Sequence, residues 1–597
     1  MKKLLMLLLA GLLSFSLISC KKTGTNPPDL PVYIPDENRN AAFDEYVDGL
    51  LTTIFAPNDP NIIFTIGDPD KYGLQYSKPD FTNATLAQIK EGAEKAKEQL
   101  ATLKTFQYDD LNYYQKLTYD ILEFGFQDSI DVEPFFYFDK DELGTFIGTN
   151  SDLPYVYIAW PLTSKASLDA MLYTIDNLPG TFQTYIDFEV ARAKVGIPKT
   201  EVTYKEIVSQ AQLIVDEGDD FFLIEKLKER ITEVPGLSQD ETSDYQERIV
   251  ASLKKNYIEA YRRIVEQLPK LYNQATPIDK SGLYHFAKGK DYYRYLLQYN
   301  VGVTESPDAI FDYLDKQKEQ KLNSCISILQ KNSKLDTSAE PTLYKNNNVN
   351  EMIEFLAAAL DKDGAFPVIK KPQYATEEID KSLQENFSPA AYFSPLMDMP
   401  YRNLVLINPS SNRPDMLSTV AHETYPGHLY QMNYVANSDL PLVRKAIGVT
   451  GYIEGWAKYA DHFAGKYVPD VPAYKIQFFS DWNDYVYIVW AMVDVGVNDK
   501  GWDIAETRSF MSEALGYDVG DEGAEYYFNV IQENPTNMLQ YYYSYFLIED
   551  YKVDFKNKLG SKYSDLLFHR SVLEIGAVPL EMLKKHLNAV ADAVLSD

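Results

Sequence analysis

Apolar residues recur at three- and four-residue intervals along most of this chain, and this period limits the folds that it can adopt. The segment 85–103 combines the interval with strong helix formers, and segments 112–130, 167–178 and 245–268 repeat the pattern. Such spacing places apolar side chains on one face of an α-helix. Strand signals are few, and the clearest is the apolar run 403–407, which an Asn-Pro-Ser-Ser turn closes. We therefore expect a mainly α fold with one small β element.

Composition and charge narrow the classes of function. The chain has 597 residues, with 57 Lys and Arg against 87 Asp and Glu, which gives a formal net charge of −30. A field of this sign repels a phosphate backbone, so we expect no nucleic-acid partner. The chain has only two cysteines, Cys20 and Cys325, and this excludes a disulfide framework. A hydrophobic content of 45% is ordinary for a globular protein and predicts a large core.

The N-terminus has the plan of a secretory signal. Two lysines precede an apolar run over residues 4–18, which is too short for a committed membrane span. The run ends in Leu-Ile-Ser before Cys20, which resembles the bacterial lipobox and implies cleavage before Cys20 and lipidation of it. We expect a signal peptide over 1–19, a tether over 20–40 and a lipid-anchored protein of the bacterial cell envelope. The alternative is an ordinary signal peptide that ends in a cysteine.

Two of the six histidines lie in one short segment that carries the chemistry. His422 and Glu423 open the string HETYPGH, and His428 closes it. The string is similar to the zincin signature, in which two helical histidines hold zinc and the glutamate beside the first is the base. Residues six apart sit about 240° around a regular helix, so the two imidazoles would not share a metal there. Because a Pro-Gly pair intervenes, we predict that the helix is distorted over 425–427 and that the histidines meet.

A third metal ligand is expected from a second helix. Catalytic zinc takes three protein ligands and a water, and imidazole suits it. Glu454 follows His428 by 26 residues, a distance that suits a helix packed against the first after a turn. Asp461 lies seven residues further on, two helical turns away on the same face. We predict that Glu454 completes the site and that Asp461 accepts the N–H of a ligating histidine.

Three strings of the sequence together resemble one family. HETYPGHLYQ, EGWAKYAD and LLFHRSVLEIGAVPLEML resemble the bacterial DUF885 family, and the likeness covers nearly the whole mature chain. These proteins look like gluzincin metallopeptidases, which implies a large helical body with the strand 403–407 beside the zinc helix. The resemblance implies Zn2+ as the cofactor, His422, His428 and Glu454 as its ligands, and Glu423 as the base.

The resemblance also suggests residues that handle the substrate. Tyr541 falls where the family has a tyrosine and is a candidate donor to an oxyanion, although its tyrosine-rich stretch is also typical of core packing. Asn498 stands where members often carry a histidine, and an amide can hydrogen-bond a substrate but cannot become a cation. We expect the strand 403–407 to be a sheet edge that pairs with an extended peptide, and Asn408 at its end to bind substrate.

These patterns predict a lipid-anchored zinc metallopeptidase in which Glu423 activates the zinc-bound water for attack on a peptide bond. Its partners are then a peptide substrate and, through the lipid, a membrane. Two alternatives stay open: a non-catalytic lipid-anchored protein that binds glycan or peptide, and a zinc hydrolase of a non-peptide amide. A proline-rich break suggests an N-terminal helical part (41–390) and a catalytic helical part (391–597), which can also form one body.

Overall fold

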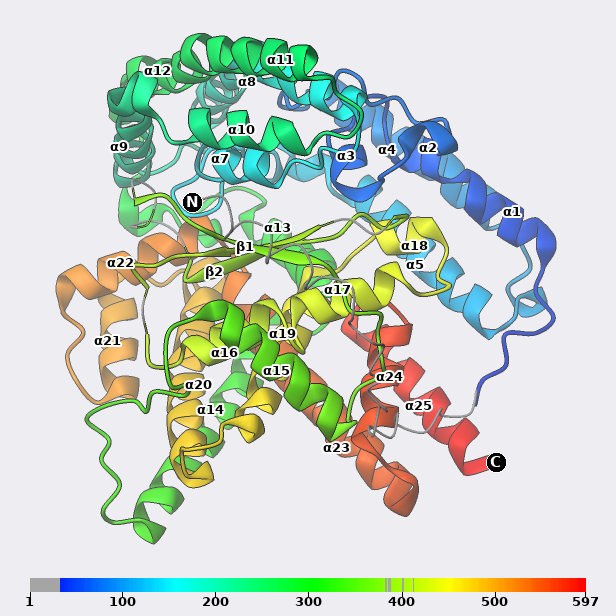
Figure 1. The fold of residues 1–597 in the computed structure, drawn as a ribbon. Coiled ribbons are helices and arrows are strands. Elements are labelled where there is room, and N and C mark those ends of the chain that lie inside the picture. Colours follow the sequence, from blue (N-terminus) through cyan, green and yellow to red (C-terminus); the bar gives the residue numbers. More distant parts are fainter. Residues whose placement is uncertain (1–32, 382–383, 385–387, 400–401, 412, 597) are drawn as a thin grey trace, which may run out of the picture.

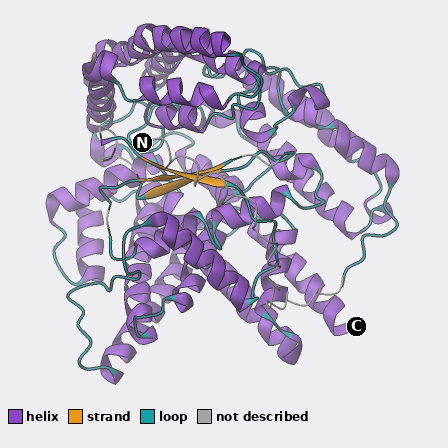
Figure 2. Ribbon diagram, in the orientation of Figure 1, coloured by secondary structure: helices purple, strands orange, loops and turns teal. Residues whose placement is uncertain are grey.

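The computed structural model describes residues 33–381, 384, 388–399, 402–411 and 413–596. In this part of the chain helices predominate, and a small three-stranded sheet lies among them (Figure 2). The mainly α fold expected from the apolar spacing is thus confirmed. The predicted signal peptide, Cys20 and the first part of the predicted tether fall outside the described residues. Among the described helices, none is long and apolar enough to cross a membrane.

The first half of the chain forms the upper layer and the right flank of the molecule in Figure 1. Its helices are α1 (Ala41–Gly49), α2 (Leu51–Ile54), α3 (Asn61–Thr65), α4 (Leu86–Leu103), α5 (Tyr113–Asp131), α6 (Phe136–Asp139), α7 (Thr149–Ala159), α8 (Lys165–Lys194), α9 (Glu201–Glu217), α10 (Leu223–Arg230), α11 (Gln239–Ser252) and α12 (Ile258–Gln267). Helix α4 matches the segment expected from its spacing, and a capping box between Thr85 and Gln88 fixes its start. The longer helices enclose an upper core that includes Phe182, Tyr204 and Tyr261.

The helices of the second half lie mostly below the sheet in the same view (Figure 1). They are α13 (Gly289–Leu296), α14 (Pro307–Lys331), α15 (Val349–Asp363), α16 (Met416–Glu423), α17 (His428–Ala436), α18 (Leu442–Ala446), α19 (Thr450–Ala464), α20 (Ala473–Val495), α21 (Ile504–Leu515), α22 (Gly520–Glu533), α23 (Ser544–Leu559), α24 (Asp565–Glu574) and α25 (Leu580–Ser596). Helix α19 packs against both α16 and α23. Trp456 of α19 is fully buried in the lower core, so this helix is fixed where the site forms.

The sheet has the strand order β1-β3-β2. β3 (Asn403–Ile407) is parallel to β1 (Tyr374–Glu378) and antiparallel to β2 (Ala390–Phe393). The strand expected at 403–407 is therefore present, but the prediction that it is a sheet edge is wrong. All five of its residues are buried, as a continuous apolar run requires when both faces of a strand are covered. The two edge strands of the sheet are β1 and β2.

Strand β3 contributes to two cores. Leu404 and Leu406 belong to the upper core, whereas Val405 and Ile407 belong to the lower one. This division follows from the strand itself, because successive side chains point to opposite faces of a sheet. The predicted division of the chain at residues 390 and 391 falls inside β2. One sheet therefore joins the two predicted parts.

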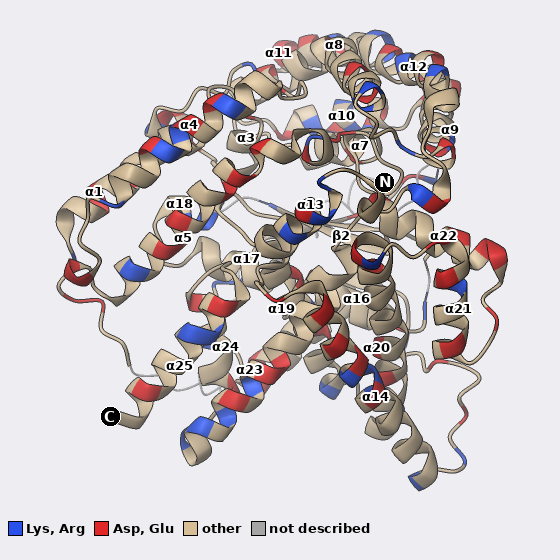
Figure 3. Cartoon of the chain, turned by 180° about the vertical axis from the view of Figure 1, so that it is seen from behind, with Lys and Arg blue, Asp and Glu red and all other residues tan. Residues whose placement is uncertain are grey.

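Charged side chains are spread over both groups of helices. Figure 3 shows Asp and Glu interspersed with Lys and Arg on helices such as α4, α11, α20 and α21. Many form exposed pairs along one helix, such as Lys95 with Glu91 at 2.8 Å. Pairs of this kind contribute little to stability, because water and salt screen them. The acidic surplus is thus a property of the surface as a whole.

Candidate metal centre

The segment between the two motif histidines ends one helix and starts another. Helix α16 ends at Glu423 and α17 begins at His428. The rings of His422 and His428 lie side by side, with their centroids 4.7 Å apart. The predicted distortion over 425–427 is therefore confirmed, because a regular helix would hold the two rings on different faces.

Close backbone approach fixes the shape of this break. The Gly427 N–H donates to Ala421 O at 3.0 Å, so the chain folds back onto the end of α16. A Cβ atom on Gly427 would lie 1.8 Å from His422 O, which leaves room for no side chain. From the other side, the indole N–H of Trp456 donates to Pro426 O at 3.1 Å. Glycine and the α19 tryptophan together hold the break in place.

Replacing Gly427 by Ala is expected to lower the free energy of unfolding by about 1–3 kcal/mol, since the added methyl group meets backbone that must shift. Urea unfolding measures the change in the free energy of unfolding. Gly92→Ala on α4 is the matched control, because its new Cβ meets nothing within 4 Å, and a gain of about 0.5–1 kcal/mol is expected there. Equal stability of the two variants would contradict the account of the break.

Three side chains meet beside the break with donor atoms that suit a metal. The ligand atoms of His422, His428 and Glu454 all lie within 4.8 Å of one another. Glu454 Oε2 is 3.4 Å from His422 Nε2 and 3.3 Å from His428 Nε2. Two imidazoles and one carboxylate form a donor set that catalytic zinc takes. The structure thus brings together the three residues that the sequence predicts as ligands.

The burial and the low pKa of the Glu454 carboxylate suit a cation bound between the three side chains. Its Oε2 atom is buried and, among the described residues, has no hydrogen bond of good geometry, and such an acceptor is costly unless something satisfies it. Burial alone would raise the pKa of Glu454, but His428 and His422 hold it well below its ordinary value. Burial would lower the pKa of His422, yet Asp461 and Glu454 raise it to about 10. The surrounding carboxylates therefore favour a positive charge at the centre of the site.

A chain of charged residues begins at the Nδ1 atom of His422. This atom lies 3.5 Å from Asp461 Oδ2, which is the placement predicted for Asp461. Asp461 also pairs with Lys458 at 3.3 Å and with His462 Nδ1 at 2.6 Å, and His462 Nε2 lies 2.9 Å from Asp484. Lys458, His462 and Asp484 were not among the residues predicted for the site. Lys458 lies three residues before Asp461 and four before His462, so helical spacing alone places it beside both side chains.

Glu423 and Tyr541 lie at the same site with different protonation preferences. Burial raises the pKa of Glu423, and the neighbouring His422 and His428 offset part of that rise. The Tyr541 ring stacks on His422 with centroids 5.9 Å apart. Burial and the negative charges of Glu454 and Glu423 raise the pKa of Tyr541 well above its ordinary value, so this phenol keeps its proton. The site thus has a carboxylate suited to take a proton and a hydroxyl suited to donate a hydrogen bond.

These residues line a cavity of about 770 Å3. One wall contains the three candidate ligands, Glu423 and Tyr541, and β2 borders the same space. Other lining residues come from the upper layer of helices and include Tyr155, Gln210 and Leu213. The volume lies in the range of typical ligand sites.

Two predicted substrate-binding residues do not line this cavity. Asn408 donates to Gln384 O and accepts from the Ser410 N–H, so its amide shapes the turn after β3. Asn498 is fully buried and accepts from the Leu283 N–H at 3.2 Å. The structure therefore gives both amides contacts within the fold rather than at the site. The sequence shows that they are polar but not which way they face.

The family model described as "Bacterial protein of unknown function (DUF885)" matches residues 65–587. The chain belongs to the DUF885 family. No curated protein matches this DUF885 chain significantly. The family description assigns no activity, so the chemistry must be argued from the site.

Solved structures support the fold of this DUF885 chain. A protein described as a lipoprotein, from Colwellia psychrerythraea, matches with a TM-score of 0.78 and 18% identity, over 92% of this chain and 99% of that one. A lipoprotein described as of unknown function, from Shewanella oneidensis, matches with a TM-score of 0.60 and 16% identity, over 92% and 99%. At these identities the likeness shows the fold alone. A Pz peptidase A structure reaches only a TM-score of 0.38 at 11% identity, over 87% and 98%, and this supports no argument.

Proposed function

We propose that this DUF885 protein is a zinc-dependent peptidase. The observation that carries the proposal is the meeting of His422, His428 and Glu454 within 4.8 Å, with Glu423 directly after the first ligand in the sequence. These three residues would hold the ion. When bound, zinc supplies a Lewis acid that acidifies a water and polarises a carbonyl group.

The remaining residues of the site have separate roles in the proposed reaction. Glu423 accepts a proton from the attacking water and passes it to the leaving amine. Burial raises the pKa of Glu423, and this suits both transfers. A group that takes and then gives a proton works best when its pKa lies closer to the ambient pH than that of an ordinary carboxyl group. Tyr541 donates its O–H to the carbonyl oxygen as negative charge develops there. Asp461 orients the imidazole of His422 through its Nδ1 atom.

The edge strand β2 supports a peptide as the substrate. β2 pairs with β3 on one side, and its other edge has no strand partner in the described part of the chain. Its residues Ala390–Phe393 line the cavity beside His428 and Glu423. An extended peptide can add to such an edge through main-chain hydrogen bonds, which do not depend on its sequence.

A mixed-peptide digest read by mass spectrometry tests the function. Three samples are compared: the protein with zinc, the protein after chelation, and the chelated protein with zinc restored. We expect cleavage in the first and third samples only, because the ligands hold the ion that the reaction needs. Absence of cleavage from all three would contradict a peptidase, and equal cleavage after complete removal of metal would contradict the role of zinc.

We also propose that the protein is anchored to the bacterial cell envelope through a lipid on Cys20. The support is the lipobox-like sequence before Cys20 and the description of two proteins of similar fold as lipoproteins. Labelled palmitate is expected in the wild-type protein and not in Cys20→Ser. Equal labelling of the two proteins would contradict the anchor.

A further inference from the structure

Three large apolar side chains are exposed where the upper layer borders the cavity. Phe146, Ile147 and Leu213 all line the cavity, and each is close to half exposed. Single exposed apolar residues are common, but neighbouring ones beside a ligand cavity indicate an interaction site. Gln210 of α9 donates to Thr145 O at 2.9 Å, so the turn of α9 that precedes Leu213 is tied to the loop of Phe146. The three side chains thus belong to one surface, which we call the apolar rim.

The loop that presents Phe146 and Ile147 is closed tightly on itself. Asn150 accepts from the Gly144 N–H and donates to Gly144 O, both at 2.9 Å. A Cβ atom on Gly144 would lie 1.9 Å from Ile147 O, so the loop leaves no room for a side chain there. These contacts fix the loop in the conformation that exposes the two apolar side chains.

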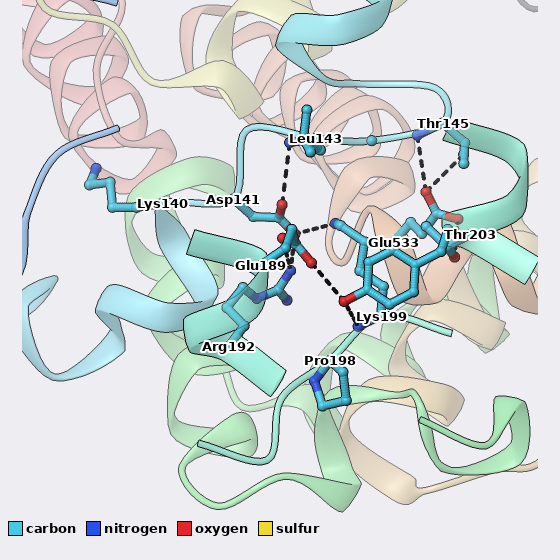
Figure 4. Close-up of polar contacts among 12 residues, drawn as sticks. Lys140, Asp141, Leu143, Thr145, Glu189, Arg192, Pro198, Lys199, Thr203 and Glu533 are labelled. Atoms are coloured by element: carbon cyan, nitrogen blue, oxygen red, sulfur yellow. Dashed lines mark hydrogen bonds and ion pairs between the residues drawn. The ribbon is translucent and has the colours of Figure 1, made fainter. Parts of the chain in front are cut away.

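Polar contacts also anchor the loop to its surroundings. Glu533 at the end of α22 accepts from Thr145, from its N–H at 3.3 Å and from its hydroxyl at 2.7 Å, and also from the Thr203 hydroxyl at 2.8 Å (Figure 4). At the start of the loop, Asp141 pairs with Arg192 at 2.6 Å and with Lys199 (Figure 4). A loop held in this way cannot easily turn its apolar side chains inward. The exposure of the apolar rim is therefore built into the fold.

We propose that the apolar rim is a specificity subsite that binds a large apolar side chain of the peptide substrate. This inference rests on the proposed peptidase function and adds a preference to it. The rim and the candidate metal centre line the same cavity, so a peptide held at the centre can extend to the rim. Covering the rim removes apolar surface from water, and the preformed loop avoids an ordering cost on binding. The rim contributes binding energy at a distance from the reacting bond.

The test uses peptides of one length that are all alanine except for one phenylalanine, placed at each position in turn. We expect the wild-type protein to prefer one of them to the all-alanine peptide. In the double variant Phe146→Ser with Ile147→Ser, kcat/KM for that peptide is expected to fall about tenfold to a hundredfold, mainly through KM. Cleavage of the all-alanine peptide, which places no large side chain on the rim, is expected to fall by much less. An equal loss on both peptides, or no loss, would overturn the subsite.

A matched control separates the rim from exposed apolar surface in general. Ile147 is 54% exposed and Val553 on α23 is 53% exposed, but Val553 does not line the cavity. Val553→Ser is expected to keep the preference of the wild type. Leu213→Ser tests the part of the rim that α9 contributes. This variant is expected to weaken the preference for the phenylalanine peptide without changing the loop of Phe146. Loss of the preference in Val553→Ser would also overturn the proposal.

Binding distinguishes failure of the subsite from failure of the peptidase function. If the wild type cleaves none of the peptides, the function fails, and the Kd of a fluorescein-labelled form of each peptide is measured instead. We then expect the wild type to bind one phenylalanine peptide more tightly than the alanine peptide, and the double variant to lose about tenfold or more of that difference. Equal Kd values for the two proteins would overturn the subsite by itself.

Discussion

Replacing Glu423 by Gln is expected to lower kcat for peptide cleavage by about 10²–10⁴-fold while zinc stays bound. Gln keeps the size of the side chain but cannot accept a proton from the attacking water. Glu423 is not among the three side chains whose donor atoms converge, so the metal site keeps its ligands. Initial rates of peptide cleavage and the zinc content of the same sample measure the two effects.

The control for this change is Glu522→Gln, which removes an exposed carboxylate on α22 outside the cavity. Its kcat is expected to equal that of the wild type. A Glu423→Gln protein that kept more than about a tenth of the wild-type kcat would contradict the role of Glu423 as the base. Loss of zinc in the same variant would mean that Glu423 acts on the metal rather than on the water.

Replacing His428 by Ala is expected to lower zinc affinity by more than about a hundredfold, because changing a residue that only supports a ligand already costs about 10–100-fold. The change removes one of three donors and leaves Glu454 with a single imidazole beside it. Zinc content after dialysis, measured by mass spectrometry of the metal, is expected to fall from about one ion per chain to near none.

His285→Ala is the matched control, since it removes a partly buried histidine that does not line the cavity. This variant is expected to keep its zinc. Full zinc retention by His428→Ala would contradict the account of the helix break, because the break is what places His428 beside His422. Equal loss in His285→Ala would show that the measurement reports unfolding instead.

The meeting of the candidate ligands could be predicted in part because its geometry follows from short-range rules. Two histidines six positions apart do not fit one face of a helix, so the Pro-Gly pair predicted a break, and the structure has one between α16 and α17. Glu454 and Asp461 share one face of α19 by their spacing alone. The helical period and the chemistry of the side chains support these inferences, and the resemblance to the DUF885 family implies the same ligands.

Long-range placement could not be predicted in the same way. The run 403–407 indicates a strand, but not that β1, with its two glutamates, would cover one edge of it. Asn408 and Asn498 are polar residues close to recognisable motifs, and only tertiary contacts show that they bond within the fold. Phe146 precedes the candidate metal ligands by more than 270 residues in the sequence, and no local pattern indicates that it lines their cavity.

Anomalous diffraction at the zinc absorption edge, from crystals of the purified protein, tests the central claim most directly. Peaks above and below the edge distinguish zinc from other ions and locate it among the residues. The account predicts one strong peak in contact with His422, His428 and Glu454. A zinc-loaded crystal with no peak there, or with its peak at other residues, would contradict it.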